Sequence, residues 1–356
     1  MIRFSHNTAT TCQRIFTPVT FPVYGVRPIS IALGDFNRDG NLDAAIASST
    51  SGSVTVLFGN GMNNVFRFWL LSITDTPEAI TAGDFNRDGY QDLIVTTSNQ
   101  NKVAIYINDA DNGFTFLLSK FVGNNPNSVA VGDFNNDTYL DIIVANKGDN
   151  NVMVLFGNGR DDITGIVTFS QVTSPASVAI GDMYRDGRLD LVVANSNQNT
   201  ITVLAGNGIN GLSGTRVFSA GNNPTAVAVV DLNRDGNLDV VVTNGDSNSV
   251  SVLLGDGIGN VTSQVIFPTG KYPVAVVTGD FNLDNNTDVA TANFAENSIN
   301  ILYGNGINGV IANTKISTLP GPISLAAGDF NNDGNLDLVV VNSANDTATV
   351  LVNLCQ

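Results

Sequence analysis

Short apolar runs alternate with polar turns along nearly the whole chain. Around Asp231, residues 225–230 are apolar and β-branched, and an Asp-rich loop separates them from a second apolar run at 238–243. A third run at 250–254 follows a polar turn, and a weaker fourth run covers 261–267. Runs this short suit buried or half-buried strands, and no helical periodicity of useful length interrupts them. The pattern therefore predicts an all-β protein.

The same four-run unit recurs at a fixed spacing of 49 residues. Its marker is Asp-x-Asn-x-Asp-Gly-x-x-Asp, complete in some copies and altered in others, with a Pro seven residues before each copy. The copies begin at Asp35, Asp84, Asp133, Asp182, Asp231, Asp280 and Asp329, and the prolines are Pro28, Pro77, Pro126, Pro175, Pro224, Pro273 and Pro322. Four strands in a unit of this length are typical of a β-propeller blade. We therefore predict a seven-bladed β-propeller of four-stranded antiparallel blades.

The two ends of the chain decide between a closed ring and an open β-solenoid. Cys12 and Cys355 are 343 residues apart, which is seven repeats, and they share the phase of the turn between the third and fourth strands. The last unit stops at that turn, whereas residues 13–23 have the phase of a fourth strand. The N-terminal strand, around 14–19, should therefore complete the last blade beside 349–353, and a Cys12–Cys355 disulfide should hold it there. The predicted domains are an N-terminal extension at 1–12 and a single propeller at 13–356.

The repeated Asp loops are candidate calcium sites. The chain has 30 Asp but only two Glu, and 21 of these Asp lie in the seven loops. Three carboxylates within nine residues repel one another unless a cation lies between them, and Ca²⁺ accepts six to eight oxygens at flexible geometry. Mg²⁺ prefers to keep its waters, and softer metals prefer Cys or His. The alternative is an ordinary Asp-rich turn that caps itself. Recurrence in seven blades favours calcium, as a structural rather than a catalytic ion.

In each loop the predicted ligands are the side chains at positions one, three, five and nine of the motif and the backbone carbonyl at position seven. We expect up to seven Ca²⁺, one per blade. The predicted ligands are Asp35, Asn37, Asp39, Asn41, Asp43, Asp84, Asn86, Asp88, Tyr90, Asp92, Asp133, Asn135, Asp137, Tyr139, Asp141, Asp182, Asp186, Arg188, Asp190, Asp231, Asn233, Asp235, Asn237, Asp239, Asp280, Asn282, Asp284, Asn286, Asp288, Asp329, Asn331, Asp333, Asn335 and Asp337.

The seven copies are not equal. The fourth loop has Tyr184 at position three, so one oxygen ligand is lost, and we expect it to be the weakest site. Position six, where Gly40 permits the sharp bend, is Thr138 in the third loop and Asn285 in the sixth. A residue with a side chain costs roughly 1 kcal/mol there if the bend needs a positive φ, although Asn tolerates that region better.

These loops resemble the FG-GAP or VCBS repeats of integrin α-subunit head domains and of many secreted proteins. The segment Gly-Asp-Phe-Asn-Arg-Asp-Gly-Asn-Leu-Asp at 34–43 and its copies carry the resemblance, which covers residues 13–355. It implies a seven-bladed propeller with calcium between the first and second strands of each blade. It does not specify a function, because relatives include adhesion heads, a fungal lectin and modules attached to enzymes. Tyr184, Thr138, Asn285 and Val230, which replaces the Gly before the fifth motif, depart from the family pattern.

Composition excludes several classes of partner and chemistry. A net charge of −16 and a pI near 4.1 argue against nucleic acid, because phosphate would be repelled. The only His is His6, so His-based triads and His-rich zinc sites are excluded. No apolar stretch is long enough to span a membrane, and residues 1–12 lack the apolar run of a signal peptide. Calcium loops and a disulfide nevertheless lead us to expect an extracellular or cell-surface monomer.

The face opposite the Asp loops is the expected ligand surface, by analogy with integrin-like propellers. It carries the turns between second and third strands and the segments before each periodic Pro. Amides and aromatic rings there suit protein or glycan ligands; the candidates are Tyr24, Arg27, Asn99, Gln100, Lys147, Asn197, Gln198, Lys271, Tyr272 and Phe294. We expect a binding module of adhesion or matrix type and not an enzyme. The alternatives are a lectin and a polysaccharide-active enzyme, for which Asp75 and Glu78 are a weak carboxylate pair.

Overall fold

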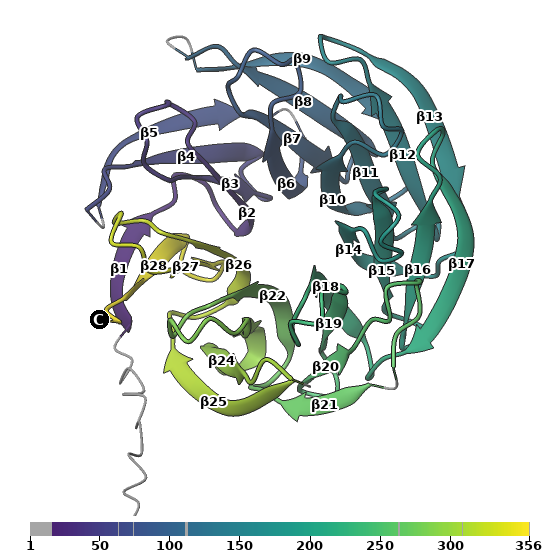
Figure 1. Ribbon diagram of the computed structural model, residues 1–356. Helices are drawn as coiled ribbons and strands as arrows, with labels where there is room; N and C mark the ends of the chain where they lie inside the picture. Colours follow the sequence, from purple (N-terminus) through teal and green to yellow (C-terminus); the bar gives the residue numbers. More distant parts are fainter. Residues whose placement is uncertain are drawn as a thin grey trace, which may run out of the picture.

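The computed structural model describes residues 16–62, 64–73, 75–110, 113–262, 264–307 and 309–355. Within these residues the chain forms seven four-stranded antiparallel sheets and a short 3₁₀ helix, η2 (Phe294–Glu296). The sheets lie side by side around a common centre, with the first strand of each nearest that centre (Figure 1). The predicted seven-bladed β-propeller is confirmed.

Six blades are continuous in sequence. They comprise β2 (Pro28–Gly34), β3 (Asp43–Ser48), β4 (Ser53–Gly59) and β5 (Val65–Ser72); β6 (Pro77–Gly83), β7 (Asp92–Thr97), β8 (Lys102–Asn108) and β9 (Phe114–Phe121); β10 (Pro126–Gly132), β11 (Asp141–Asn146), β12 (Asn151–Gly157) and β13 (Ile163–Phe169); β14 (Pro175–Gly181), β15 (Asp190–Asn195), β16 (Thr200–Gly206) and β17 (Leu212–Ser219); β18 (Pro224–Val230), β19 (Asp239–Asn244), β20 (Ser249–Leu253) and β21 (Val265–Pro268); and β22 (Pro273–Gly279), β23 (Asp288–Asn293), β24 (Ser298–Gly304) and β25 (Val310–Ser317).

The seventh blade joins the two ends of the chain. It consists of β26 (Pro322–Gly328), β27 (Asp337–Asn342), β28 (Thr347–Asn353) and the N-terminal β1 (Phe16–Pro22), which is antiparallel to β28. Phe16 lies opposite Asn353 and Pro22 opposite Thr347. The predicted ring closure is confirmed, and Figure 1 shows the C-terminus beside β1. Cys12 and residues 13–15 lie outside the described residues, so the disulfide to Cys355 and the boundary at 12/13 stay predictions.

The periodic sequence markers coincide with strand ends. Each marker Pro begins the first strand of its blade, where its missing N–H does not interrupt a ladder, and position nine of each Asp motif begins the second strand. One strand differs from expectation. The fourth strand of the fifth blade begins at Val265, and Val261 forms only an isolated bridge with Gly255. Gly259 has a φ of 79°, a conformation that a strand does not adopt.

The apolar core is divided among the seven blade boundaries. At the boundary of the last and first blades, Ile46 of β3 packs with Val339 and Val341 of β27. The second residue of every Asp loop belongs to the cluster that its blade shares with the next one, and these residues are Phe36, Phe85, Phe134, Met183, Leu232, Phe281 and Phe330. Each loop is therefore anchored in an inter-blade core, which positions its polar residues. No helix among the described residues is long and apolar enough to cross a membrane.

Candidate functional site

Each Asp loop bends through two residues with positive φ. Position six has a φ of 84° at Gly40, and the same region is kept by Thr138 (72°) and Asn285 (63°). The bend that we predicted at this position is thus present in the two loops that lack Gly. Position four is also left-handed, with a φ of 57° at Arg38. Sequence analysis missed this second bend: Asn136 and Asn332 at position four are residues that adopt it readily, but Arg or Leu stands there in the other five loops.

The first loop is closed by its own backbone. The N–H groups of Asp39 and Gly40 donate to Oδ1 and Oδ2 of Asp35, at 3.0 and 2.9 Å. The N–H of Asp39 also donates to Oδ1 of Asn37 at 3.0 Å, and the N–H of Asn41 donates to Oδ1 of Asp39 at 2.9 Å. The side chains at positions one, three and five therefore act as acceptors for the backbone N–H groups of the loop itself.

Position nine has a different role from the other acidic positions. Asp43 is fully buried, and its Oδ2 and Oδ1 accept the N–H groups of Phe36 and Gly59 at 2.8 and 2.9 Å. The carboxylate thus joins the loop to the end of the third strand. The same pair of bonds recurs in five other blades, at Asp92, Asp141, Asp239, Asp288 and Asp337. Asp190 in the fourth blade also accepts two backbone N–H groups, but one donor is shifted by one residue.

Burial dominates the electrostatics of position nine. It raises the pKa of Asp43 to about 7, against the two backbone hydrogen bonds that lower it, and the charges of Asp39 and Asp35 raise it further. Asp141 and Asp288 have pKa values of about 7 for the same reasons. Each loop therefore concentrates negative charge around a carboxyl group that is already desolvated.

The donor set has the chemistry that calcium requires, because every side-chain ligand in six loops is an Asp or Asn oxygen. The arrangement is that of a self-capped turn. Among the residues that the structure describes, no three His, Cys, Asp or Glu side chains are gathered closely enough to hold a metal ion. A cation would have to draw the oxygens of positions one, three and five together in place of some backbone donors. The single hydrogen bond at each oxygen of position nine leaves a lone pair for a further partner.

Adjacent loops contact each other through positions four and seven, which sequence reasoning missed. The guanidinium of Arg38 lies 4.2 Å from the ring centre of Tyr90 in the next loop, and Nδ2 of Asn332 donates to Oδ1 of Asn41 at 2.8 Å across the ring closure. Similar contacts link Arg87 to Tyr139 and Arg185 to Asn237. Position seven, predicted as a carbonyl ligand, thus also receives a side chain from the preceding blade.

The fourth loop departs from the others in structure as well as in sequence. Its position nine, Asp190, accepts the N–H of Tyr184 rather than that of Met183. The Tyr184 ring lies beneath the guanidinium of Arg216, 5.5 Å away. Arg188 forms an ion pair of 3.4 Å with Asp186. This loop therefore contains a cation of its own beside the carboxylate at position five.

The opposite face carries the predicted ligand candidates. Nine of the ten side chains are exposed on the turns between second and third strands or just before a marker Pro, and Lys147 is half-buried. The Tyr24 ring stacks on Phe68 with centres 3.7 Å apart. Asp75 and Glu78 line two different pockets: Asp75 accepts the Gln100 N–H, and Glu78 accepts the Ser98 hydroxyl.

Comparisons with known proteins agree with this architecture. BBS1N, solved in complex with ARL6DN, has a TM-score of 0.67 at 15% identity, covering 96% of this chain and 97% of that one. Virginiamycin B lyase from Staphylococcus aureus has a TM-score of 0.67 at 13% identity, covering 95% and 99%. These likenesses show the fold alone. The comparison with curated proteins found no match.

The repeat itself gives the more specific match. The profile of the FG-GAP-like repeat matches six overlapping windows, 35–95, 84–144, 133–193, 182–242, 231–291 and 280–340, each of which begins at an Asp motif. Together the windows cover most of the chain. Each window begins at the Asp loop of one blade and ends in the second strand of the next blade. The apolar cluster at the boundary of two blades contains residues from both of these segments. The chain therefore belongs to the FG-GAP-like repeat family.

Proposed function

We propose that this chain is an extracellular, monomeric binding propeller whose Asp loops hold calcium and whose opposite face receives a protein or glycan. The family and fold support a propeller module that binds a ligand or organises a structure. In the proposal, positions one, three, five and nine and the position-seven carbonyl hold the ion in each complete loop. Bound Ca²⁺ would supply the positive charge that the loop carboxylates lack.

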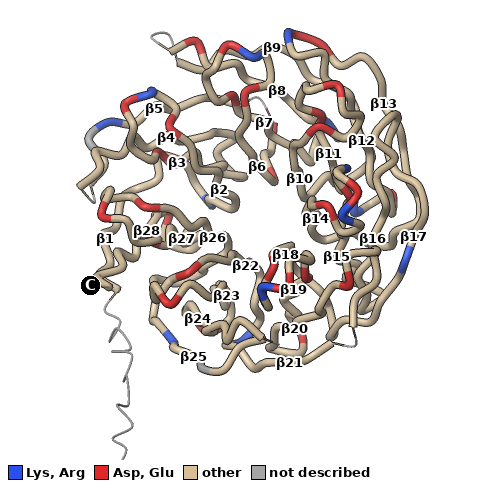
Figure 2. The backbone as a smooth tube through the Cα atoms, viewed as in Figure 1, with Lys and Arg blue, Asp and Glu red and all other residues tan. Residues whose placement is uncertain are grey.

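The observation that carries the calcium proposal is the missing counter-charge. All 21 loop carboxylates are described, and only Asp186 forms an ion pair with a basic side chain. Acidic residues recur around the whole ring, whereas basic residues are few (Figure 2). Seven divalent ions would offset most of the net charge of −16. A turn that caps itself needs hydrogen-bond acceptors at these positions but not their negative charge.

Thermal unfolding in EDTA and in millimolar Ca²⁺ tests the proposal. Ca²⁺ should raise the midpoint because an ion that binds only the native loops stabilises them, by ~2.7 kcal/mol per site at 100 times Kd. The same concentration of Mg²⁺, as the control, should raise it less. An equal midpoint in EDTA and Ca²⁺, with metal removal verified by elemental analysis, would contradict calcium binding.

The ligand side of the proposal rests on the exposed amides and rings of the opposite face. BBS1N is described in a complex with another protein, which supports a protein ligand, and a screen of glycans in Ca²⁺ and in EDTA tests the sugar alternative. The lyase neighbours show that this fold can also carry catalysis. Here Asp75 and Glu78 line different pockets, and turnover of a polysaccharide would overturn the binding-module assignment.

A further inference from the structure

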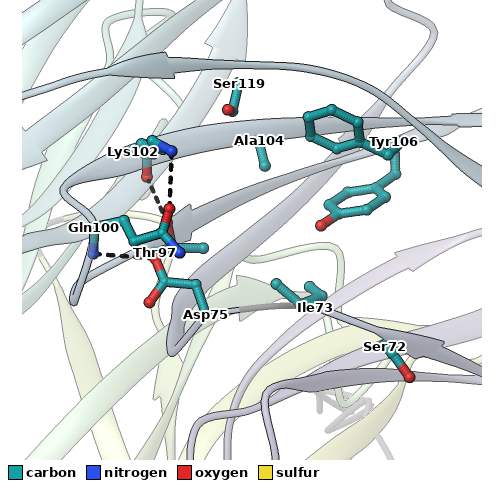
Figure 3. Close-up of a pocket in the computed structure, with 10 residues that line it drawn as sticks. Ser72, Ile73, Asp75, Thr97, Gln100, Lys102, Ala104, Tyr106 and Ser119 are labelled. Carbon is teal, nitrogen blue, oxygen red and sulfur yellow. Dashed lines mark hydrogen bonds between the residues drawn. The ribbon is translucent and has the colours of Figure 1, made fainter.

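A pocket of about 310 Å³ lies at the boundary of the first and second blades (Figure 3). One wall comes from the end of β5 and the segment after it, with Ser72, Ile73 and Asp75. The other comes from the second blade, where Thr97 and Ala104 lie on neighbouring strands. The pocket is near the β7–β8 turn, which belongs to the face opposite the Asp loops.

The repeats explain why space opens at this boundary. In the fourth blade, the residue equivalent to Thr97 is Asn195, whose Nδ2 donates to Thr202 at 2.8 Å and whose Oδ1 accepts the N–H of Thr173 at 3.1 Å. This amide thus bridges two blades and fills the groove between them. Asn244 does the same with Ser251 and Gly221.

The second blade lacks both members of this bridge. Its equivalents of Asn195 and Thr202 are Thr97 and Ala104, and the Thr97 hydroxyl turns to the carbonyl of Lys102 in its own blade, at 3.3 Å. The groove therefore keeps a volume that the amide fills in the fourth and fifth blades. The exchange concerns only two residues, Thr97 and Ala104, but it removes the amide and the second hydroxyl from this groove.

Tyr106 contributes a polar group to the floor of this space. The other six blades have Leu at the equivalent position. Tyr106 is 6% exposed, and burial followed by the charge of Asp75 raises its pKa. Its ring lies edge-on to Phe116, with centres 5.7 Å apart. Figure 3 shows its hydroxyl directed into the space between Ala104, Ile73 and Asp75. A phenol hydroxyl that opens into a pocket can donate one hydrogen bond to a ligand and accept another.

The other end of the pocket is lined by Asp75, Gln100 and Lys102, whose formal charges sum to zero. Oδ2 of Asp75 accepts the N–H of Gln100 at 3.1 Å, and Nζ of Lys102 donates to Oε1 of Gln100 at 2.8 Å. Each side chain makes fewer hydrogen bonds than its chemistry allows. A carboxylate, an amide and an ammonium group are therefore available together, while Ile73, Ala104 and Phe116 supply apolar surface.

We propose that this pocket binds one neutral, polyhydroxylated ring, that is, a single sugar residue. Hydroxyl groups that both donate and accept match the carboxylate, amide, ammonium and phenol groups, and the apolar surface matches the C–H face of a pyranose. The opposite charges of Asp75 and Lys102 cancel, so a net ionic ligand gains little. The proposal deepens the binding-module function by naming a ligand class and a site, and it does not depend on calcium.

Saturation-transfer NMR with methyl glycosides of glucose, galactose, mannose and N-acetylglucosamine tests this site. At least one glycoside should bind with a Kd of ~1 mM, which is typical of a small ligand with few polar contacts. The variant Thr97→Asn/Ala104→Thr, which carries the pair found in the fourth blade, should bind at least about tenfold more weakly. The matched control Thr202→Ala truncates the equivalent position in the fourth blade and should leave binding unchanged.

A second variant keeps the test informative if the filled pocket folds poorly. Tyr106→Phe removes only the hydroxyl and should weaken glycoside binding with no shift in thermal midpoint beyond that of the control. Transfer to none of the glycosides, or equal transfer to the filled variant, overturns the proposal. Displacement of the glycoside by glycine or leucine, as zwitterionic probes, overturns the ligand class.

Measurements in Ca²⁺ and in EDTA separate this proposal from the calcium proposal. Glycoside binding in EDTA without any calcium-dependent midpoint shift supports the pocket and contradicts calcium binding. A calcium-dependent midpoint without glycoside binding contradicts the pocket and supports calcium binding.

Discussion

The first and fourth Asp loops have the same length and the same place in their blades, yet the partners of their carboxylates differ. In the first loop, Asp35 and Asp39 have only neutral hydrogen-bond donors. In the fourth, Arg188 stands at position seven and pairs with Asp186. The oxygen of position three is also absent there, because Tyr184 packs beside Gly259 instead. In the fourth loop an exposed Arg therefore supplies positive charge beside Asp186, whereas the calcium proposal assigns that role in the first loop to a metal ion.

The comparison separates two roles within one motif. Position nine keeps its two backbone hydrogen bonds in both loops, at Asp43 and at Asp190. Positions three and seven both differ between these two loops, and position seven is also Tyr90 and Tyr139 in loops that keep Asn at position three. The constant bonds indicate that position nine serves the fold in every blade, whereas the calcium proposal assigns the variable positions to ion binding.

The largest expected effect is therefore that of position nine. Asp43→Ala leaves the buried N–H groups of Phe36 and Gly59 without acceptors, which costs ~1–3 kcal/mol each. The free energy of unfolding in EDTA should fall by roughly 2–6 kcal/mol, and Asp190→Ala should do the same in the fourth blade. Urea denaturation measures both. A loss that is seen in Ca²⁺ but not in EDTA would mean that the carboxylate serves only the ion.

Rebuilding the fourth loop should give the next largest effect. Tyr184→Asn/Arg188→Asn supplies the oxygens of a complete loop and removes the internal cation, so the protein should bind one more Ca²⁺. The calcium-dependent stabilisation should increase by ~2.7 kcal/mol at 100 times Kd. Elemental analysis and thermal unfolding measure the two changes.

Single ligand deletions provide the control for that gain. Asp329→Ala, in a complete loop, should remove one bound ion, whereas Asp182→Ala in the fourth loop should leave the count nearly unchanged. An unchanged count in the rebuilt loop, or equal losses from both deletions, would contradict the distinction between the two kinds of loop.

The smallest expected effect concerns backbone strain at position six. Thr138 has a φ of 72°, a region that is unfavourable for a β-branched residue. Thr138→Gly should raise the free energy of unfolding in EDTA by roughly 1 kcal/mol, because Gly adopts this region without a steric penalty. Thr138→Ala is the control, since it removes the branch and keeps the Cβ. Equal stability of the Gly and Ala variants would show that the bend is not strained.

Much of the architecture could be predicted because the sequence repeats at a fixed spacing. The motif and its Pro recur every 49 residues, and each blade is built from neighbouring segments, so local patterns located nearly every strand. The closing strand could be predicted as well, since the phase of 13–23 marks it as a fourth strand. The exception is the fourth strand of the fifth blade, which begins only at Val265, with Val261 in an isolated bridge to Gly255.

The Asp loops could be predicted only in part. Their oxygen-rich composition and the bend at position six follow from residue types, which are visible in the sequence. That Asp43 binds Gly59 depends on the third strand returning to the loop, and that Arg38 reaches Tyr90 depends on the angle between blades. Neither partner is marked by spacing within one repeat.

The pocket between the first and second blades could not be predicted from the sequence either, because it depends on how the two blades pack. Thr97, Ala104 and Tyr106 are visible in the sequence as departures from the repeat, but their effect on the groove depends on Asp75 and Ile73 of the preceding segment. Periodic sequence determined which strands form and in what order, because strand formation and pairing are local within a blade. The packing of one blade on the next decided which side chains meet, because those contacts join different repeats.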